Sequence, residues 1–169
     1  MTALAKPQPA EALDGASSVR KYYLETLGLV ERLHRKLLDV IKDELDRRDE
    51  REINSVQALL LFNVGDQELT AGELRTGGHY LGSNVSYNLK KLVETGYIHH
   101  ERSELDRRSV LVRLTPKGEV IRTLLRDLFD RHLGSLEAVG NVGADNLESL
   151  NTTLKRLERF WIDQVRFRL

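Results

Sequence analysis

Apolar residues recur every three or four positions near both ends of the chain. The first stripe lies between about residues 18 and 48 and consists of Leu24, Leu27, Val30, Leu33, Leu37, Ile41 and Leu45. The second stripe lies near the C-terminus and consists of Leu147, Leu150, Leu154, Leu157, Trp161 and Val165. This spacing predicts two long amphipathic helices. Since such stripes exceed what one small domain can cover, we expect the terminal helices to pair with a second copy across a two-fold axis.

Between the stripes, the pattern predicts a short helix, a turn and a second helix. Thr70, with a glutamate three residues on, forms a capping box that begins the short helix, and Gly77–Gly78 is expected to end it. The second helix is expected to begin at Gly82 or Ser83 and to end at Gly96, which suits a left-handed cap. Its apolar side comprises Val85, Leu89, Leu92 and Val93. A polar or basic opposite face, on a helix that follows a turn, suits the major groove of DNA.

After Gly96 the apolar positions alternate, which is strand spacing. The stretches Tyr97–Arg102 and Ser109–Leu114 predict a hairpin, and Glu68–Leu69 predicts a short strand beside it. Thr115 is a suitable N-cap, and the proline that follows it suits the first position of a long helix that reaches about residue 138.

The predicted fold is mostly α with a small β-hairpin wing, a winged helix-turn-helix with long N- and C-terminal dimerisation helices. We expect a flexible N-terminal arm at residues 1–17 and a dimerisation helix at 18–52. The winged helix-turn-helix DNA-binding domain is expected at 53–118, with Asn54 capping its first helix. Connecting and C-terminal dimerisation helices are expected at 119–169.

The candidate DNA-binding residues lie on the polar helix face and on the hairpin. They are Ser83, Asn84, Ser86, Tyr87, Lys90 and Lys91 on the helix and Arg102, Arg107 and Arg108 on the hairpin. The early helix residues are expected near base edges and the lysines near phosphates. At the hairpin tip, Asp106 is expected to pair with Arg108 and structure the loop, while Arg107 reaches the minor groove, although the sequence is compatible with the reverse.

Two stretches resemble a known family. Val85–Ile98 and Asp106–Gly118 resemble the recognition helix, wing and wing exit of MarR-type transcriptional regulators. The resemblance implies a homodimeric bacterial regulator that binds a pseudo-palindromic operator in double-stranded DNA, often a repressor released by a small molecule. The chain is also similar to the alphaproteobacterial LdtR branch, which implies control of cell-wall remodelling or stress genes. It departs from the family at Gly77–Tyr80, where an apolar residue is usual.

The resemblance also implies an effector pocket where the dimer helices meet the winged domain. The candidate lining residues lie on the helix of the first apolar stripe and on the helix after it: His34, Leu37, Leu38 and Ile41 on the first, and Leu59, Leu60 and Asn63 on the next. An apolar cleft with a few polar groups suits a small aromatic or phenolic effector.

Composition narrows the function classes. The chain has 26 basic and 26 acidic residues and therefore no net charge, which by itself argues mildly against DNA binding. The segment Gly77–Gly118, however, contains seven basic and four acidic residues, a local excess of three. The absence of cysteine excludes disulfides and a thiol-based sensor. Without a run of about eighteen apolar residues or an export signal, we expect no membrane association and a cytoplasmic protein, nucleoid-associated when bound to DNA.

The sequence offers little for catalysis. His99, His100 and Glu101 are candidate metal ligands, but on a strand His100 points away from the other two, so we expect no metal site. There is no nucleophile elbow, phosphate loop or dinucleotide fingerprint, and we expect neither an enzyme nor a cofactor. The alternative function is a winged module for protein association. We favour DNA binding because protein interfaces concentrate aromatic and apolar anchors rather than lysines and arginines.

Overall fold

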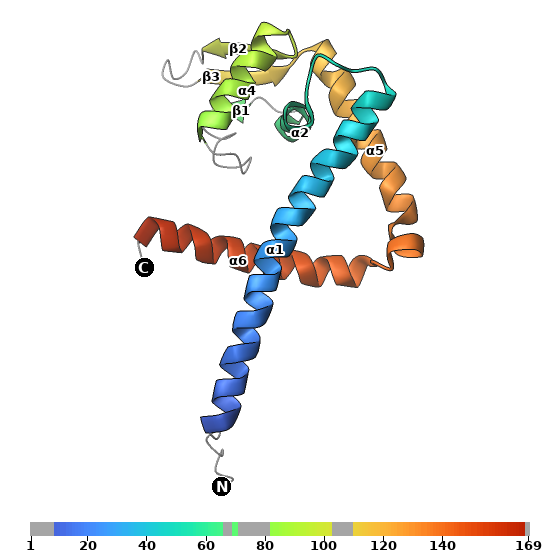
Figure 1. The fold of residues 1–169 in the computed structure, drawn as a ribbon. Helices are drawn as coiled ribbons and strands as arrows, with labels where there is room; N and C mark the ends of the chain where they lie inside the picture. Colours follow the sequence, from blue (N-terminus) through green and yellow to red (C-terminus); the bar gives the residue numbers. More distant parts are fainter. Residues whose placement is uncertain (1–8, 66–68, 71–81, 103–109, 168–169) are drawn as a thin grey trace. The chain divides into compact units, whose positions relative to one another are not determined.

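The computed structural model describes residues 9–65, 69–70, 82–102 and 110–167. Its contacts divide the chain into two compact units, residues 1–122 and 123–169. Figure 1 shows the elements in chain order: α1 (Pro9–Arg47), α2 (Ser55–Val64), β1 (Leu69–Thr70), α4 (Gly82–Glu94), β2 (Ile98–Arg102), β3 (Val110–Leu114), α5 (Pro116–Gly140) and α6 (Ala144–Phe167). The predicted class, mostly helical with a small β-hairpin wing, is confirmed.

Helix α1 begins earlier than its apolar stripe suggests. The structure places its first residue at Pro9, so the prediction of a flexible arm over residues 1–17 is wrong for residues 9–17, and residues 1–8 lie outside the described part. Proline is tolerated in the first turn of a helix, and the alanines and leucine that follow are good helix formers. Gly15 costs the helix only about 1 kcal/mol relative to alanine. The helix ends at Arg47, five residues before the end of the predicted segment 18–52.

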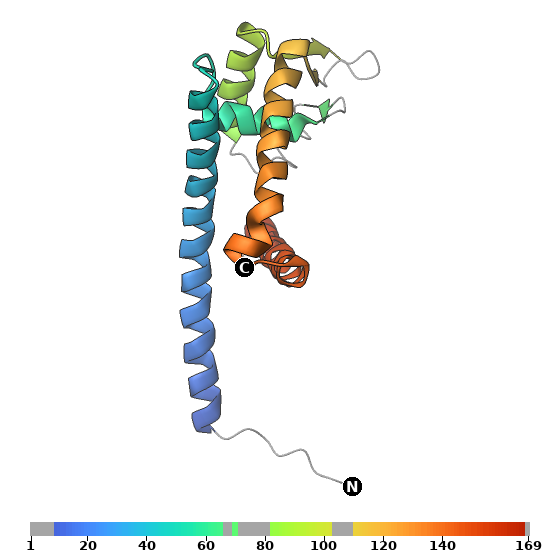
Figure 2. The ribbon, with the colours of Figure 1, turned by 90° about the vertical axis from the view of Figure 1, so that its right-hand side faces the viewer.

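Helix α2 begins after Asn54, the N-cap that the sequence predicts, and the structure shows a capping box there. The Asn54 side chain accepts a hydrogen bond from the Gln57 backbone N–H at 2.9 Å, and the Gln57 side chain accepts one from the Asn54 N–H at 3.1 Å. In Figure 2, α2 runs crosswise to α1 beside the C-terminal half of α1, and the two helices are in contact. Ile41 of α1 is fully buried. Leu60 and Leu61 of α2 are buried as well. Burial of these side chains forms the core of the first unit.

The sheet contains three antiparallel strands in the order β1-β3-β2. In β2 and β3, Ile98 lies opposite Leu114, and Arg102 lies opposite Val110. The backbone of β1 pairs with β3 at Val112 and Leu111, which confirms the short strand predicted beside the wing, one residue further along. The short helix predicted after Thr70 falls on residues 71–81 and lies outside the described residues.

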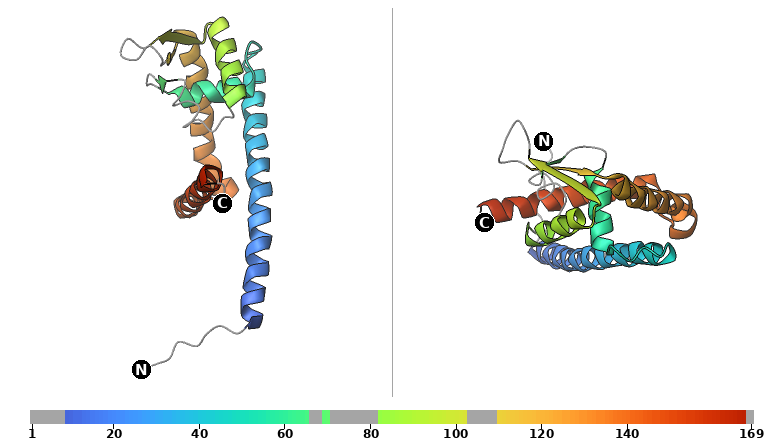
Figure 3. Two further views of the ribbon diagram at one scale, coloured as in Figure 1. Left: turned by 90° about the vertical axis from the view of Figure 1, so that its left-hand side faces the viewer. Right: turned by 90° about the horizontal axis from the view of Figure 1, so that it is seen from above.

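Helices α2 and α4 lie between α1 and the sheet in the first unit, as the view from above shows (Figure 3). Leu92 of α4 and Val112 of β3 are buried in this layer. Gly96 adopts a φ of 77°, the left-handed conformation predicted for the cap after α4. The sheet and α2 therefore support α4 on its apolar side.

The second unit contains the part of α5 from residue 123 onward, and α6. A short connection at 141–143 separates the two helices, and Asn141 at its start has a φ of 51°. Its N–H donates to the Glu137 carbonyl at 3.0 Å, which ends α5. No described residue of α6 is buried. Within the described residues, no helix combines the length and apolar character needed to cross a membrane.

Candidate nucleic-acid interface

Helix α4 presents a polar face opposite its buried residue. Tyr87, Lys90 and Lys91 lie at helical spacings of three and four, and Tyr87 is 68% exposed. The side chains of Lys90 and Lys91 are 79% and 50% exposed. Leu92, on the other side of the helix, is fully buried. The burial of Leu92 agrees with the predicted apolar side of α4, whereas Val93, which was predicted on the same side, is 36% exposed.

The first turn of α4 and the hairpin tip are less completely described. Ser86 is exposed, whereas the side chains of Ser83 and Asn84 lie outside the described part. On the hairpin, the backbone of Arg102 is placed at the end of β2. Asp106, Arg107 and Arg108 lie outside the described residues. The DNA contacts assigned to all of these residues stay predictions.

Glu94, which sequence analysis did not select, lies beside both lysines. Its Oε1 is 3.9 Å from Lys90 Nζ, and its Oε2 is 3.8 Å from Lys91 Nζ. The spacing of three and four residues along one helix was a signal for this contact. The polar face of α4 thus combines two ammonium groups with one carboxylate.

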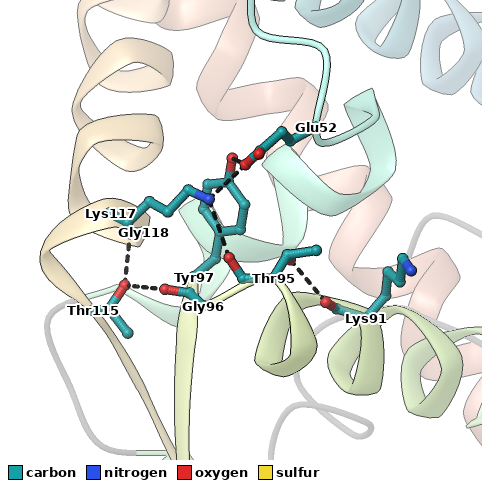
Figure 4. Close-up of polar contacts among 8 residues, drawn as sticks. All are labelled: Glu52, Lys91, Thr95, Gly96, Tyr97, Thr115, Lys117 and Gly118. Atoms are coloured by element: carbon teal, nitrogen blue, oxygen red, sulfur yellow. Dashed lines mark hydrogen bonds and ion pairs between the residues drawn. The ribbon is translucent and has the colours of Figure 1, made fainter.

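The end of α4 is joined to the start of α5 and to the loop between α1 and α2 by polar side chains (Figure 4). We call this group the clasp; its side chains are Glu52, Tyr97, Thr115 and Lys117. Lys117 Nζ lies 2.5 Å from Glu52 Oε2 and donates a hydrogen bond to the Thr95 carbonyl at 3.1 Å. The hydroxyl of Tyr97 donates to the same Glu52 oxygen at 3.2 Å. Lys117 Nζ also lies 4.2 Å from the centre of the Tyr97 ring, within reach of a cation–π interaction.

These contacts shift the pKa values of three clasp side chains. Hydrogen bonds from Lys117 and then Tyr97 lower the pKa of the Glu52 carboxyl, because both stabilise its charged form. The same bond to Glu52 raises the pKa of Lys117. Burial raises the pKa of the Tyr97 hydroxyl. Near neutral pH, the clasp therefore contains a charged Glu52–Lys117 pair and a neutral tyrosine.

Thr115 fixes the exit of β3 against the cap of α4. Its hydroxyl donates to the Gly96 carbonyl at 2.7 Å and accepts from the Gly118 N–H at 3.1 Å, which confirms it as the N-cap of α5. The Thr115 N–H donates to the Tyr97 carbonyl at 3.1 Å. A Cβ atom on Gly118 would lie 2.3 Å from that carbonyl oxygen, so the close approach requires glycine. The wing exit and the end of α4 are held together by backbone as well as side-chain contacts.

The polar strand face carries a further ion pair. Arg113 Nη2 lies 3.1 Å from Glu101 Oε1 across β2 and β3. The side chains of His99, His100 and Glu101 are all exposed. This pair lies on the described part of the hairpin and reduces its net positive charge.

A hollow of about 350 Å³ lies between α4 and the sheet. Its apolar lining residues are Leu89, Val93, Ile98 and Val112, and its polar ones are Ser86, Lys90, Glu94 and His100. A mainly apolar lining with a few polar and charged groups has the character of a small-molecule site.

The residues predicted to line an effector pocket lie in different environments. Ile41 and Leu60 are buried in the core with 0% and 1% exposure, whereas His34, Leu37 and Asn63 are exposed. Leu38 and Leu59 are partly buried. The predicted pocket stays a prediction, and its two core members offer no surface to a ligand in this conformation.

Sequence reasoning also missed Glu52 and the hydroxyl of Tyr97. Glu52 is 65 residues from Lys117 along the chain, so no local spacing predicts their contact. The run from Thr115 to Gly118 was recognised as a helix start, but its attachment to Gly96 was not.

Comparison with known proteins agrees with this architecture. Residues 53–118 match the family model of a winged helix DNA-binding domain. The exopolysaccharide II synthesis transcriptional activator ExpG of Rhizobium meliloti (strain 1021) is 35% identical over 159 residues, which cover 94% of this chain and 81% of that protein.

Solved structures of regulators are similar as well. A point mutant of MarR from E. coli in complex with operator DNA is 25% identical, with a TM-score of 0.61, and the match covers 80% of this chain and 95% of that one. FabT of Streptococcus pneumoniae in complex with DNA shares the fold with a TM-score of 0.63 at 20% identity, and the match covers 83% of this chain and 98% of that one.

Proposed function

Since the chain belongs to the MarR family of winged helix-turn-helix transcription regulators, we propose that it acts as a homodimer whose two α4 helices read a pseudo-palindromic operator. The family places it among DNA-binding regulators rather than enzymes.

The observation that carries the proposal is the exposed face of α4 with Tyr87, Lys90 and Lys91 on it. Lysines on an exposed helix face neutralise phosphates, which supplies affinity for any duplex. Ser83, Asn84, Ser86 and Tyr87 precede the lysines, nearer the N-terminal end of the helix that enters the groove in this fold. We therefore propose that these residues contact base edges and that Lys90 and Lys91 contact phosphates. Arg102 and Arg107 extend the interface along the wing in this proposal, and Asp106 holds Arg108.

Anisotropy titrations test this assignment on an operator selected from a random pool and on a scrambled duplex. We expect Lys90→Ala to lower the affinity for both duplexes by the same factor. Substitution of Ser86 or Tyr87 by alanine is expected to lower the binding free energy by about 1–3 kcal/mol for the operator and by less for the scrambled duplex. Lys36→Ala, which removes an exposed α1 lysine paired with Asp39, is the matched control. Equal losses on both duplexes for every α4 variant would refute base reading, and salt-independent binding would favour a protein-association module.

The homodimer proposal rests on apolar surface in both terminal helices. Exposed apolar side chains on α1 are Val19, Tyr22, Tyr23, Leu24, Leu29, Val30, Leu33, Leu37 and Val40. Those on α6 are Leu150, Phe160, Ile162, Val165 and Phe167. Large apolar surfaces of this kind mark protein interfaces, and a second copy covers the same surface on both partners.

Light scattering after size exclusion tests the dimer. Leu33 is 62% exposed, so Leu33→Glu leaves the core of one chain intact but introduces a charge into the proposed interface. We expect the mass of this variant to fall to that of a monomer and its operator affinity to drop. Glu31→Ala, which removes an exposed ion pair with Arg35 on the same helix, is expected to remain dimeric. A monomeric wild-type chain would refute the proposal.

We also propose that a small aromatic or phenolic ligand releases the DNA. Such a ligand acts only if it prefers a dimer whose α4 helices no longer match half-sites about 34 Å apart. The hollow beside α4 and the predicted lining residues His34 and Leu38 are alternative sites for it. A thermal-shift screen of phenolic compounds identifies binders, and Val93→Phe and Leu38→Phe distinguish the two sites. If stabilising compounds leave operator affinity unchanged, release by a ligand is refuted.

The target genes are proposed from the relative's name and from the LdtR resemblance. ExpG is named for exopolysaccharide synthesis, and the LdtR resemblance points to the cell wall and stress. We propose that this chain regulates genes for cell-surface polymers. Transcript sequencing in strains with and without the regulator tests this, and its sign distinguishes activation from repression.

A further inference from the structure

Glu94 lies within the α4 face that we propose for DNA contact. It follows Tyr87 by seven residues, Lys90 by four and Lys91 by three, spacings that place all four side chains on one side of a helix. Its two carboxylate oxygens divide between the lysines, with Oε1 3.9 Å from Lys90 Nζ and Oε2 3.8 Å from Lys91 Nζ. One carboxylate thus interacts with both ammonium groups assigned to phosphates.

The stability of the helix does not explain a glutamate at this position. Glu94 is the last residue of α4, where a negative charge opposes the helix dipole. Each lysine precedes the glutamate, which is the less favourable order for such pairs. All three side chains are at least half exposed, and ion pairs in water contribute little to folding.

From these observations, and resting on the proposed DNA-binding function, we infer that Glu94 is a specificity-determining residue that competes with DNA phosphates for Lys90 and Lys91. Affinity for duplexes of any sequence comes largely from lysines and arginines that neutralise phosphates. A carboxylate between two such lysines lowers this affinity, because each lysine must exchange one anion for another. Hydrogen bonds from the first turns of α4 to base edges do not depend on these lysines. Glu94 therefore lowers binding to non-cognate DNA and leaves base reading in place.

The test uses the full-length chain and a fluorescein-labelled duplex of mixed sequence. Glu94→Gln keeps the size of the side chain and removes its charge. From Coulomb attraction at about 4 Å in water, we expect its affinity to rise roughly three- to ten-fold at low salt. This gain in affinity is expected to shrink as salt rises from about 50 to 200 mM. The plot of log affinity against log salt concentration should be steeper for Glu94→Gln, by up to about the equivalent of one phosphate contact. Asp39→Asn is the matched control, because it removes the same charge from an exposed pair with Lys36 on α1.

A double-mutant cycle shows whether Glu94 acts through the lysines. In a chain that already carries Lys90→Ala and Lys91→Ala, Glu94→Gln is expected to raise the duplex affinity much less. An undiminished gain there, or no gain in the otherwise wild-type chain, overturns the inference. A thermal melt measures stability separately. If Asp39→Asn raises DNA affinity as much as Glu94→Gln does, the gain comes from the overall charge of the chain and the inference is overturned. If the wild-type chain binds no duplex at low salt, the proposed function fails instead, and the inference fails with it.

Discussion

Gly118 is the position where a single methyl group should disturb the clasp most. In the structure, a Cβ atom at Gly118 would lie 2.3 Å from the carbonyl oxygen of Tyr97, whereas real Cβ atoms essentially never approach closer than 3.0 Å. Gly118→Ala therefore requires a displacement of at least 0.7 Å between the start of α5 and the backbone after α4. That carbonyl also accepts the 3.1 Å hydrogen bond from the Thr115 N–H, so a displacement weakens this bond too.

The expected cost combines three effects. Overpacking costs about 1–3 kcal/mol, and a weakened buried hydrogen bond adds about 1 kcal/mol. Alanine is about 1 kcal/mol better than glycine inside a helix, which offsets part of the loss. We expect Gly118→Ala to lower the free energy of unfolding by about 1–3 kcal/mol, measured by urea denaturation followed by circular dichroism at equal protomer concentration.

Gly134→Ala is the matched control in the same helix. No atom lies within 4 Å of a Cβ placed there, so helix propensity alone acts, and we expect stability to rise by about 0.5–1 kcal/mol. The two substitutions are chemically identical and should differ in sign. If Gly118→Ala is as stable as the wild type, the close approach at Tyr97 does not constrain the fold, and the reasoning is refuted.

The remaining predictions concern the caps and the clasp. Asn54→Ala removes the N-cap of α2 and should cost about 1 kcal/mol in urea denaturation, and an unchanged midpoint would contradict the importance of the capping box. Thr115→Val leaves the Gly118 N–H and the Gly96 carbonyl without the hydroxyl and should cost about 1–3 kcal/mol in the same assay, whereas a neutral effect would mean that other groups satisfy them. Because the folded pKa of Glu52 lies below its ordinary value of 4.5, its contribution to stability is present above that pH and is lost as pH falls toward the folded pKa. Glu52→Gln should therefore weaken the loss of stability at acid pH in a pH series of melts, and parallel curves for the two proteins would contradict the charged pair.

Much of the local structure is determined by nearby residues in the sequence. The N-cap at Asn54, the left-handed Gly96 and the helix start at Thr115 were all predicted, because each depends on groups within a few residues. Apolar spacing also predicted the burial of Leu92 in α4, because a helix supported on one side places apolar residues there, although Val93 on the predicted apolar side is exposed. The start of α1 was missed because residues 9–17 lie before the apolar stripe, although their helix propensity is sufficient.

Only the tertiary structure decided which distant groups meet. Glu52 contacts Lys117 and Tyr97 because α2, α4 and the sheet bring their ends together, and no spacing along the chain records that arrangement. Burial of Ile41 and Leu60, which the sequence offered as pocket residues, likewise depends on the packing of α1 against α2. Side-chain periodicity specifies the face of one helix, but the residues that this face contacts are set by how separate elements pack, which is a long-range property of the whole fold.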